Sequence, residues 1–402
     1  MTRWVKRLAV VFVLAILGLL ALVVFGGFRL KDPQGNIAFG WDAEARRFLI
    51  MEKPELAQEG PHVFPDATGY EVIATQQDNG AWHLVRTHLP ASPLPRLTVR
   101  VGNPAGTTFH VPLRPASPAR SAVHTDNPPR LLMLSDMEGQ FDKFTALLRA
   151  QGVIDDALHW HYGTGHVALV GDFVDRGDDM TAVLWLVYAL QAEADAAGGR
   201  LHYVLGNHEH LAMSGRKKYW PSGLVALAQA LGDDGDGDER LFSAHSVLGA
   251  WLAQQPVIAR VGDHLFVHGG ISQDVIALDL DIDQINALAQ PHLHAIPENL
   301  AGEADILLGR HGLTWYRGMA MPNDTERRRE TDPAAHLQRT LARYGAKRLA
   351  IGHTLVPDIT LEQQGRLLRL DIHHAEQMPQ AALYENGVLW RVDAEGGRAR
   401  LE

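Results

Sequence analysis

The chain has 402 residues, with 37 Lys plus Arg against 47 Asp plus Glu and a formal charge of −10. This balance excludes a general nucleic-acid binder, which would show a basic face. The absence of cysteine excludes disulfides, thiolate zinc sites, iron–sulfur clusters, a cysteine nucleophile and a lipid-modified N-terminal cysteine. It leaves the compartment open. The 21 histidines therefore join Asp, Glu and Asn as the available metal ligands.

The N-terminal region contains one uncharged apolar run, residues 8–28, which is long enough for a hydrocarbon core of about 30 Å. Arg3, Lys6 and Arg7 precede it, so the positive-inside rule predicts a cytoplasmic N-terminus, although two basic residues just after the run reduce the asymmetry. We expect residues 1–30 to form an uncleaved single-pass anchor in the inner membrane, with the rest of the chain on the periplasmic face. A cleaved signal peptide and a buried core helix are the alternatives.

Residues 31–129 have a different character. Turn signals such as Asp78-Asn79-Gly80 are dense, and short β-type runs (residues 97–101 and 107–113) lie between them. The sequence predicts a small β-rich module that ends in a Pro-rich linker over residues 112–129. It carries no catalytic pattern, and packing against the following domain is favoured over a docking function.

From residue 130 to 393 strand-like and helix-like runs alternate, which predicts an α/β catalytic domain, followed by a tail over residues 394–402. Five apolar runs each end in a polar residue; they cover residues 130–134, 166–170, 200–205, 264–267 and 348–351. Open α/β sheets place their ligand sites at such carboxyl ends.

The residues at these five ends are metal-ligand types. They are Asp136 with Glu138; Asp172 with Asp175 and Arg176; Asn207 with His208 and Glu209; His268; and His353. Carboxylates, an amide oxygen and imidazoles on one rim suit a pair of divalent cations. Two such cations about 3.5–4 Å apart can clamp an in-line displacement at phosphorus. The pattern predicts a binuclear phosphoesterase.

The motifs Gly171-Asp172-Phe173-Val174-Asp175-Arg176-Gly177, Gly206-Asn207-His208-Glu209, His268-Gly269-Gly270 and Gly352-His353-Thr354 closely resemble those of calcineurin-like metallophosphoesterases. Within them the match is to the phosphoprotein-phosphatase branch, and the tetrad Trp315-Tyr316-Arg317-Gly318 resembles the bacterial Shewanella-like phosphatases. The resemblance spans about residues 130–392. It implies a sandwich of two mixed β-sheets flanked by helices.

The resemblance also implies roles for matching positions. The first metal would be held by Asp136 and Asp172, with Asp172 bridging to a second metal that Asn207, His268 and His353 complete. His208, oriented by Asp175, would donate a proton to the leaving oxygen, and Arg176 and Arg317 would hold the phosphate. Glu209 is expected to brace the loop rather than touch metal.

One position departs from the family pattern. The first motif is usually Gly-Asp-x-His-Gly, but here it is Ser135-Asp136-Met137-Glu138-Gly139, so Glu138 stands where a histidine ligand is expected. A carboxylate ligand would favour manganese or magnesium over zinc. We therefore expect Glu138 to ligate and the metals to be manganese, with iron, zinc and magnesium as alternatives. If Glu138 does not ligate, the first metal would be weakly held.

Several other patterns have ordinary explanations. His210 is expected to be a loop histidine, His373 and His374 edge histidines, and the acidic segment 233–239 a solvated loop because it lacks the EF-hand Gly and Glu. The basic segment 216–220 follows the Gly-Asn-His-Glu motif closely enough to border the pocket, where it would either attract an anionic substrate or form a surface cluster.

The sequence as a whole predicts a metal-dependent enzyme that hydrolyses phosphomonoesters without a covalent phosphoenzyme. Its expected partners are a phosphorylated substrate and, through the N-terminal run, the membrane, but no nucleic acid. The resemblance makes a phosphoserine, phosphothreonine or phosphotyrosine side chain a fair substrate. The alternatives are small phosphoesters or dinucleotide polyphosphates, and a catalytically weak, metal-bound docking protein.

Overall fold

The fold is described from a computed structural model, which places residues 28–31, 37–42, 47–52, 54–115, 124–232 and 240–401. Contacts between Cα atoms divide the chain into two compact units, Met1–Glu55 and Leu56–Glu402. The module boundary expected near residue 129 thus falls inside the second unit. Each unit is described by itself.

The first unit contains one antiparallel sheet in the order β1-β2-β3. Its strands are β1 (Phe28–Lys31), β2 (Ile37–Asp42) and β3 (Arg47–Glu52). Apart from Phe28, which begins β1, the apolar run expected to form a membrane anchor lies outside the described residues. Within the described ranges, no helix is long and apolar enough to cross a membrane.

The second unit begins with short antiparallel strands. A three-stranded sheet and a hairpin comprise β4 (His62–Pro65), β5 (Gly69–Asp78), β6 (Ala81–Pro90), β7 (Arg96–Arg100) and β8 (Thr108–Pro112). The two-residue loop between β5 and β6 is Asn79-Gly80, and both residues have positive φ, 48° and 82°. Asn-Gly is the preferred sequence for such a turn because Gly, and to a lesser degree Asn, accepts this conformation.

Two six-stranded mixed sheets follow, as expected for the family. The first has the order β12-β11-β10-β18-β19-β20. Its strands are β10 (Arg130–Leu134), β11 (His166–Val170), β12 (Arg200–Val204), β18 (Gln380–Glu385), β19 (Val388–Asp393) and β20 (Arg398–Arg400). The last strand pairs with β19, so residues expected to form a tail belong to the sheet.

The second sheet has the order β16-β17-β15-β14-β13-β9. Its strands are β9 (His124–Thr125), β13 (Ala259–Val261), β14 (His264–Phe266), β15 (Arg348–Ile351), β16 (Thr360–Glu362) and β17 (Leu367–Arg369). Strand β9 comes from the segment expected to be a linker, and it pairs in parallel with β13. Residues 116–123 of that segment lie outside the described part of the chain.

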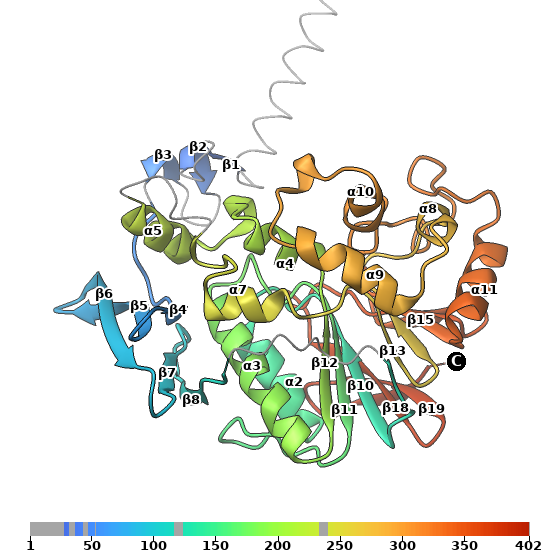
Figure 1. Cartoon of the computed structure of the whole chain (residues 1–402), viewed down its shortest axis with the longest axis horizontal. Coiled ribbons are helices and arrows are strands. Elements are labelled where there is room, and N and C mark those ends of the chain that lie inside the picture. The colour runs from blue at the N-terminus through green and yellow to red at the C-terminus, as the bar shows by residue number, and fades with distance from the viewer. Residues whose placement is uncertain are drawn as a thin grey trace, which may run out of the picture. The chain divides into compact units, whose positions relative to one another are not determined.

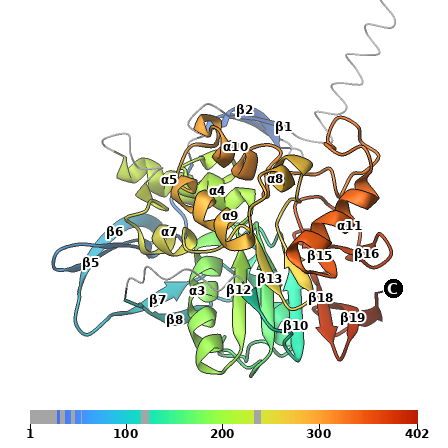
Figure 2. The same ribbon diagram turned by 45° about the vertical axis from the view of Figure 1, so that its right-hand side comes forward.

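Helices surround the two sheets (Figures 1 and 2). They are α2 (Phe141–Ala150), α3 (Met180–Ala196), α4 (Asn207–Met213), α5 (Ser222–Leu231), α7 (Val247–Leu252), α8 (Gln273–Ala277), α9 (Ile282–Ala289), α10 (Glu303–Leu308) and α11 (Pro333–Tyr344), with single 3-10 turns η1 (Lys217–Tyr219), η2 (Gln290–His292) and η3 (Pro297–Asn299). Helices α2 and α3 contact each other, and α3 packs on β12.

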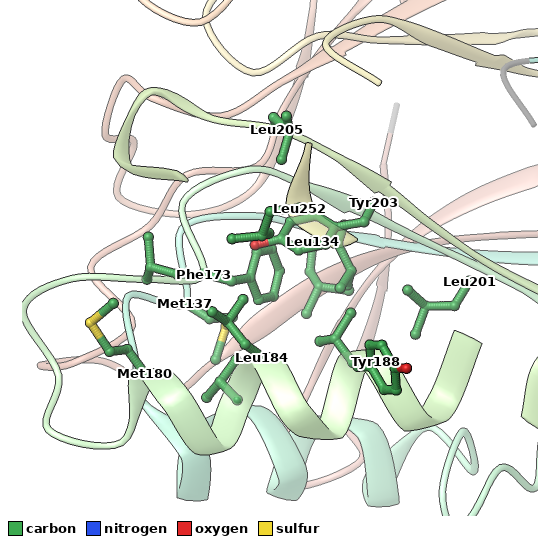
Figure 3. Packing of buried hydrophobic residues seen from close by; sticks show 14 of the residues in the cluster. Leu134, Met137, Phe173, Met180, Leu184, Tyr188, Leu201, Tyr203, Leu205 and Leu252 are labelled. Carbon is green, nitrogen blue, oxygen red and sulfur yellow. The ribbon is translucent and has the colours of Figure 1, made fainter. Parts of the chain in front are cut away.

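Both faces of the first sheet are buried, which explains why its parallel strands are continuous apolar runs rather than alternating ones. Leu132 and Leu134 of β10 join the apolar core that contains residues of α2 and α3. Leu131 and Met133 point the other way, into a core shared with residues of the second sheet. Figure 3 shows part of the helix-side core, where Leu184 of α3 lies near Leu134 and Met137. This packing fixes the register of the strands and therefore the position of their carboxyl ends.

Candidate active site

The carboxyl ends of β10, β11 and β15 carry acidic or imidazole side chains on strained backbone. Asp136, Asp172 and His353 have φ of 56°, 60° and 63°, in the left-handed region that non-glycine residues seldom occupy. Such conformations persist where the surrounding structure over-determines them, and they concentrate at functional sites. The turns aim the three side chains into the space between the two sheet ends.

Three side chains there meet as a metal-ligand cluster. One ligand atom each from Asp172, His268 and His353 lies within 4.8 Å of the others, and all three residues are buried. The Nε2 of His268 lies 2.9 Å from Asp172 Oδ2 and 3.2 Å from Asn207 Oδ1. The Nε2 of His353 is buried with no hydrogen-bond partner. An unpartnered buried imidazole nitrogen beside a carboxylate is the arrangement that a cation satisfies.

Asp136 lies next to this cluster. Its Oδ2 accepts a hydrogen bond from the backbone N–H of His353 at 3.2 Å. Burial raises the pKa of Asp136 well above its usual range, and the negative charge of Asp371 raises it further. Burial also raises the pKa of Asp371, to about 7. Two buried carboxylates that resist joint ionisation form a site where a divalent cation would relieve the repulsion.

Asp371 has no counterpart among the residues singled out from the sequence. It is 5% exposed and follows β17 closely, at the same edge of the second sheet as His353. No short motif marks it, because the segment Leu370-Asp371-Ile372 reads as an ordinary strand end. Its electrostatic interactions reach His268, Asp172 and Arg317. Asp371 reaches the site because β17, which it follows, pairs with β15.

The protonation of the cluster also fits a metal centre. Burial alone would lower the pKa of His268, but the charges of Asp172 and Asp136 outweigh it and raise the pKa to about 10. Burial and the His268 charge hold the pKa of His353 well below its usual range. The carboxylates around His268 therefore favour a positive charge that balances them. A bound cation would take over that balance and release the proton.

His208 and Asp175 form a buried pair beside the cluster. His208 Nδ1 and Asp175 Oδ2 are 2.5 Å apart, and His208 Nε2 faces Asp172 Oδ2 at 3.9 Å. Burial alone would lower the pKa of His208, but Asp172 and the bond to Asp175 outweigh it, and the pKa is raised. Burial raises the pKa of Asp175 to about 6. Such a pair can hold a proton on the imidazole near neutral pH.

The two arginines expected to bind phosphate differ in their surroundings. Arg317 Nη1 donates to the carbonyl oxygen of His353 and, at 3.1 Å, to Thr354 Oγ1. Arg176 forms an ion pair with Glu138. The structure therefore places Glu138 against Arg176, while the three-residue ligand cluster does not include it. Its role as a metal ligand stays a prediction.

Glu209 braces the loops, as expected. Its buried carboxylate accepts hydrogen bonds from the backbone N–H groups of Asp172, Phe173 and Gly206, at 2.9, 2.7 and 2.7 Å. It also accepts the hydroxyl of Tyr203 at 2.7 Å. These bonds hold the turn after β11 against the start of α4. The helix then presents Asn207 and His208 toward the cluster.

The basic segment after α4 does border the site. Tyr219, at the end of η1, places its ring centroid 4.9 Å from that of His208. Arg176 lies over the Tyr219 ring at 5.4 Å, and Lys218 lies over it at 4.7 Å. The backbone N–H of Arg176 donates to the Tyr219 carbonyl at 2.8 Å. An aromatic ring with two cations close to it thus borders the site.

Two of the other histidines, His210 and His159, have clear structural partners. His210 Nε2 lies 2.9 Å from the carbonyl oxygen of Ala295, and His159 Nδ1 lies 2.9 Å from Glu193. His374 is buried, and the Nε2 of the exposed His373 lies 3.8 Å from a carboxylate oxygen of Glu376. The acidic segment 233–239 lies outside the described residues.

Comparisons with known proteins agree with this geometry. The family model described as calcineurin-like phosphoesterase matches residues 129–357. The chain is 25% identical over 270 residues to Shewanella-like protein phosphatase 2 of Arabidopsis thaliana, covering 57% of this chain and 67% of that protein. It is 30% identical over 139 residues to a symmetrical bis(5'-nucleosyl)-tetraphosphatase of Neisseria meningitidis, covering 34% of this chain and 42% of that enzyme.

A solved structure extends the likeness. The crystal structure of the cold-active protein-tyrosine phosphatase of a psychrophilic Shewanella species matches with a TM-score of 0.73 and 26% sequence identity. The match covers 86% of this chain and 99% of that chain. The family match spans more than half of the chain and includes every strand end from Asp136 to His353. The chain therefore belongs to the calcineurin-like phosphoesterase family and is a hydrolase.

Proposed function

We propose that the chain is a phosphomonoesterase that depends on two divalent cations. The observation that carries the proposal is the ligand cluster of Asp172, His268 and His353 with the His208–Asp175 pair directly beside it. A cation cluster alone would suit a binding protein. A proton donor aimed at the same space adds what ester hydrolysis requires.

The donor set suits two cations that share Asp172. Asn207, His268 and His353 would complete one site with Asp172, and Asp136 would contribute to the other. When bound, the cations supply Lewis-acid activation of water and of the phosphoryl oxygens. The preponderance of oxygen ligands favours manganese over zinc.

The chain's own groups would handle the phosphate and the leaving group. Arg317, half-buried beside His353, offers a planar guanidinium for phosphate oxygens, as does Arg176 on the opposite loop. The Nε2 of His208 faces the cluster and would donate its proton to the leaving oxygen. Asp175 holds the imidazole through Nδ1 and so fixes which nitrogen carries the transferable proton.

The substrate we propose is a phosphorylated protein side chain. The likeness to a protein-tyrosine phosphatase over nearly all of that enzyme's length supports it. The ring of Tyr219 at the rim would pack against an aromatic or peptide substrate. The shorter match to a bis(5'-nucleosyl)-tetraphosphatase makes a dinucleotide polyphosphate the second candidate.

Phosphate release tests the proposal. The purified chain, supplied in turn with manganese, iron, zinc and magnesium, is assayed on p-nitrophenyl phosphate, phosphotyrosine and phosphoserine peptides, and diadenosine tetraphosphate. We expect turnover of the monoesters with manganese, and a fall of about 10²-fold or more in kcat for His208→Asn with unchanged metal content. No turnover with any metal would instead favour a metal-bound docking protein.

We also propose that residues 1–30 anchor the chain in the inner membrane with the catalytic domain in the periplasm. The length of the apolar run and the preceding basic residues support this orientation. Alkaline phosphatase and fluorescent-protein reporters fused after Arg29 distinguish the two sides. Alkaline phosphatase activity supports the proposal, and fluorescence from a cytoplasmic reporter contradicts it. Membrane fractionation of the full chain separates an anchor from a cleaved signal peptide.

A further inference from the structure

The residue at position 138 interacts with a phosphate-binding group rather than with the ligand cluster. Glu138 forms an ion pair with Arg176 through its Oε1. Its side chain is 23% exposed and that of Arg176 is 45% exposed, so the pair lies at the mouth of the site. A neutral side chain at this position would offer Arg176 no negative charge.

The backbone holds the two residues in this arrangement. The carbonyl oxygen of Glu138 accepts a hydrogen bond from the N–H of Gly177 at 2.9 Å, and the Glu138 N–H donates to the backbone carbonyl oxygen of Asp172 at 3.0 Å. Glu138 and Arg176 both have positive φ, 46° and 59°. These hydrogen bonds join the two loops, and each loop contains one residue in the left-handed conformation. Together they set the directions of the Glu138 and Arg176 side chains. The contact is therefore built into the strand ends and does not depend on the flexible ends of the side chains alone.

A carboxylate and a phosphate make the same demand on a guanidinium. Both accept its N–H groups, often in a bidentate manner, and both carry negative charge. A carboxylate already on Arg176 must be displaced before a phosphate oxygen can take its place. The displaced carboxylate then stands beside a dianion and repels it. Both effects weaken phosphate binding.

We propose that Glu138 is a specificity-determining residue that occupies Arg176 in the free enzyme and competes with the phosphate of substrate and product. The inference rests on the proposed function, since it assumes that phosphate binds at Arg176. Its consequence is an enzyme with a higher KM for dianionic monoesters and weaker inhibition by inorganic phosphate than the Glu138→Gln variant. Product release is correspondingly easier.

Calorimetric titration with inorganic phosphate tests the inference without turnover. Wild type, Glu138→Gln, Glu138→His and Arg176→Ala are loaded with manganese, their metal content is counted, and phosphate is titrated into each. We expect two metals per chain in wild type and in Glu138→Gln, and phosphate affinity about fivefold higher in Glu138→Gln, the amount that a partly exposed ion pair supplies. The double variant Glu138→Gln with Arg176→Ala should bind phosphate within about twofold of Arg176→Ala alone.

A matched control removes an equivalent pair elsewhere. Glu385, at the end of β18, pairs with Arg398 of the edge strand β20 at 2.9 Å in the first sheet. The variant Glu385→Gln loses the same charge and should leave phosphate affinity unchanged. An equal rise in both variants would show a general charge effect and overturn the inference.

Other outcomes are equally decisive. A fall to one metal per chain in Glu138→Gln would assign Glu138 to the metal and overturn the competition. Unchanged phosphate affinity in Glu138→Gln would also overturn it. If phosphate affinity shifts as expected but no ester is hydrolysed, the proposed function fails while the interaction between Glu138 and Arg176 stands.

Discussion

Glu209 shows how a residue that need not touch substrate can control the site. Four donors converge on its buried carboxylate, three of them backbone N–H groups of the turns that carry Asp172 and Asn207. Hydrogen bonds to a charged acceptor are stronger than neutral ones, and buried donors without an acceptor are costly. The cluster geometry therefore depends on this one side chain.

The variant Glu209→Gln tests this dependence. Its amide presents an NH₂ group to donors that need an acceptor, so we expect unfolding free energy to fall by about 3 kcal/mol and metal affinity to fall with it. Tyr203→Phe removes one of the four donors and should cost about 1.5 kcal/mol or less. Urea unfolding and metal titration measure both. Equal stabilities of the two variants would contradict the bracing role.

His202 on β12 makes stability depend on pH. Burial, and to a smaller extent the charge of His166, whose Nδ1 lies 3.1 Å from His202 Nε2, together lower the pKa of His202 to about 3. Because the folded state resists the proton that the unfolded chain accepts below about pH 6.5, this histidine's contribution to stability is present above that pH and is lost as the pH falls toward 3.

The variant His202→Gln cannot take up that proton. We expect wild type to lose about 2 kcal/mol more than this variant between pH 7 and pH 5, at about 1.4 kcal/mol per pH unit below the unfolded pKa. His83→Gln on the exposed face of β6 is the control and should follow wild type. Urea unfolding at both pH values gives the comparison. Parallel losses in wild type and His202→Gln would contradict the assignment.

At the scale of elements, the turns after the strands are set by close backbone approach. Gly171, between β11 and Asp172, has φ of 83°, and a Cβ there would meet His268 Nδ1 at 2.6 Å and Gly206 Cα at 2.7 Å. Gly152, after α2, also has positive φ, 67°, but a Cβ there would meet nothing within 4 Å. Substitutions at these two glycines therefore distinguish the cost of the backbone conformation, which both share, from the cost of a steric clash, which only Gly171 would have.

We therefore expect the two alanine substitutions to differ sharply. Gly152→Ala should lower the free energy of unfolding by about 1 kcal/mol, because only the left-handed conformation is unfavourable for alanine there. Gly171→Ala should cost at least about 2 kcal/mol more and reduce metal content, because the added carbon pushes α4 and His268 away from the turn. Thermal unfolding and metal counting measure both effects. Similar costs would show that the turn after β11 can relax.

At the scale of the whole molecule, residues 56–115 of the β-rich segment belong to the same compact unit as the catalytic sheets. Val99 of β7 belongs to the same apolar core as Phe144 of α2 and Leu184 of α3. Trp185 of α3 donates its Nε1 hydrogen to the carbonyl of Pro61 at 2.7 Å. A packing role for this segment, favoured from the sequence, agrees with these contacts.

Shared packing predicts shared unfolding. Val99→Ala should lower stability by about 2 kcal/mol through lost burial and a small cavity. It should shift the loss of secondary structure and the loss of phosphatase activity to the same lower temperature. Thr98→Ala, on the exposed face of the same strand, is the control. An activity midpoint unchanged in Val99→Ala would mean that β7 and β8 fold apart from the catalytic sheets.

Much of the site was predictable because its residues are local to strand ends. Asp136, Asp172 and His353 each follow an apolar run within a few residues, and parallel strands bring such ends to one edge. The contact of Glu138 with Arg176 was not predictable, because it joins two loops and depends on the left-handed turn at each. Strands β9 and β20 were not predicted, because strands of only two or three residues show no periodic pattern of apolar side chains.

The sequence by itself determined the chemistry: the ligand types, their order along the chain, the absence of thiolate chemistry and the alternation of strands and helices. These features follow from local sequence patterns, which do not depend on contacts with distant parts of the chain. Only the tertiary structure decided which of these groups meet. The pairing of β17 with β15 brings Asp371 to the cluster, and the joined turns place Glu138 on Arg176. Such contacts depend on sheet register and turn geometry between segments distant in sequence, which packing of the two cores fixes.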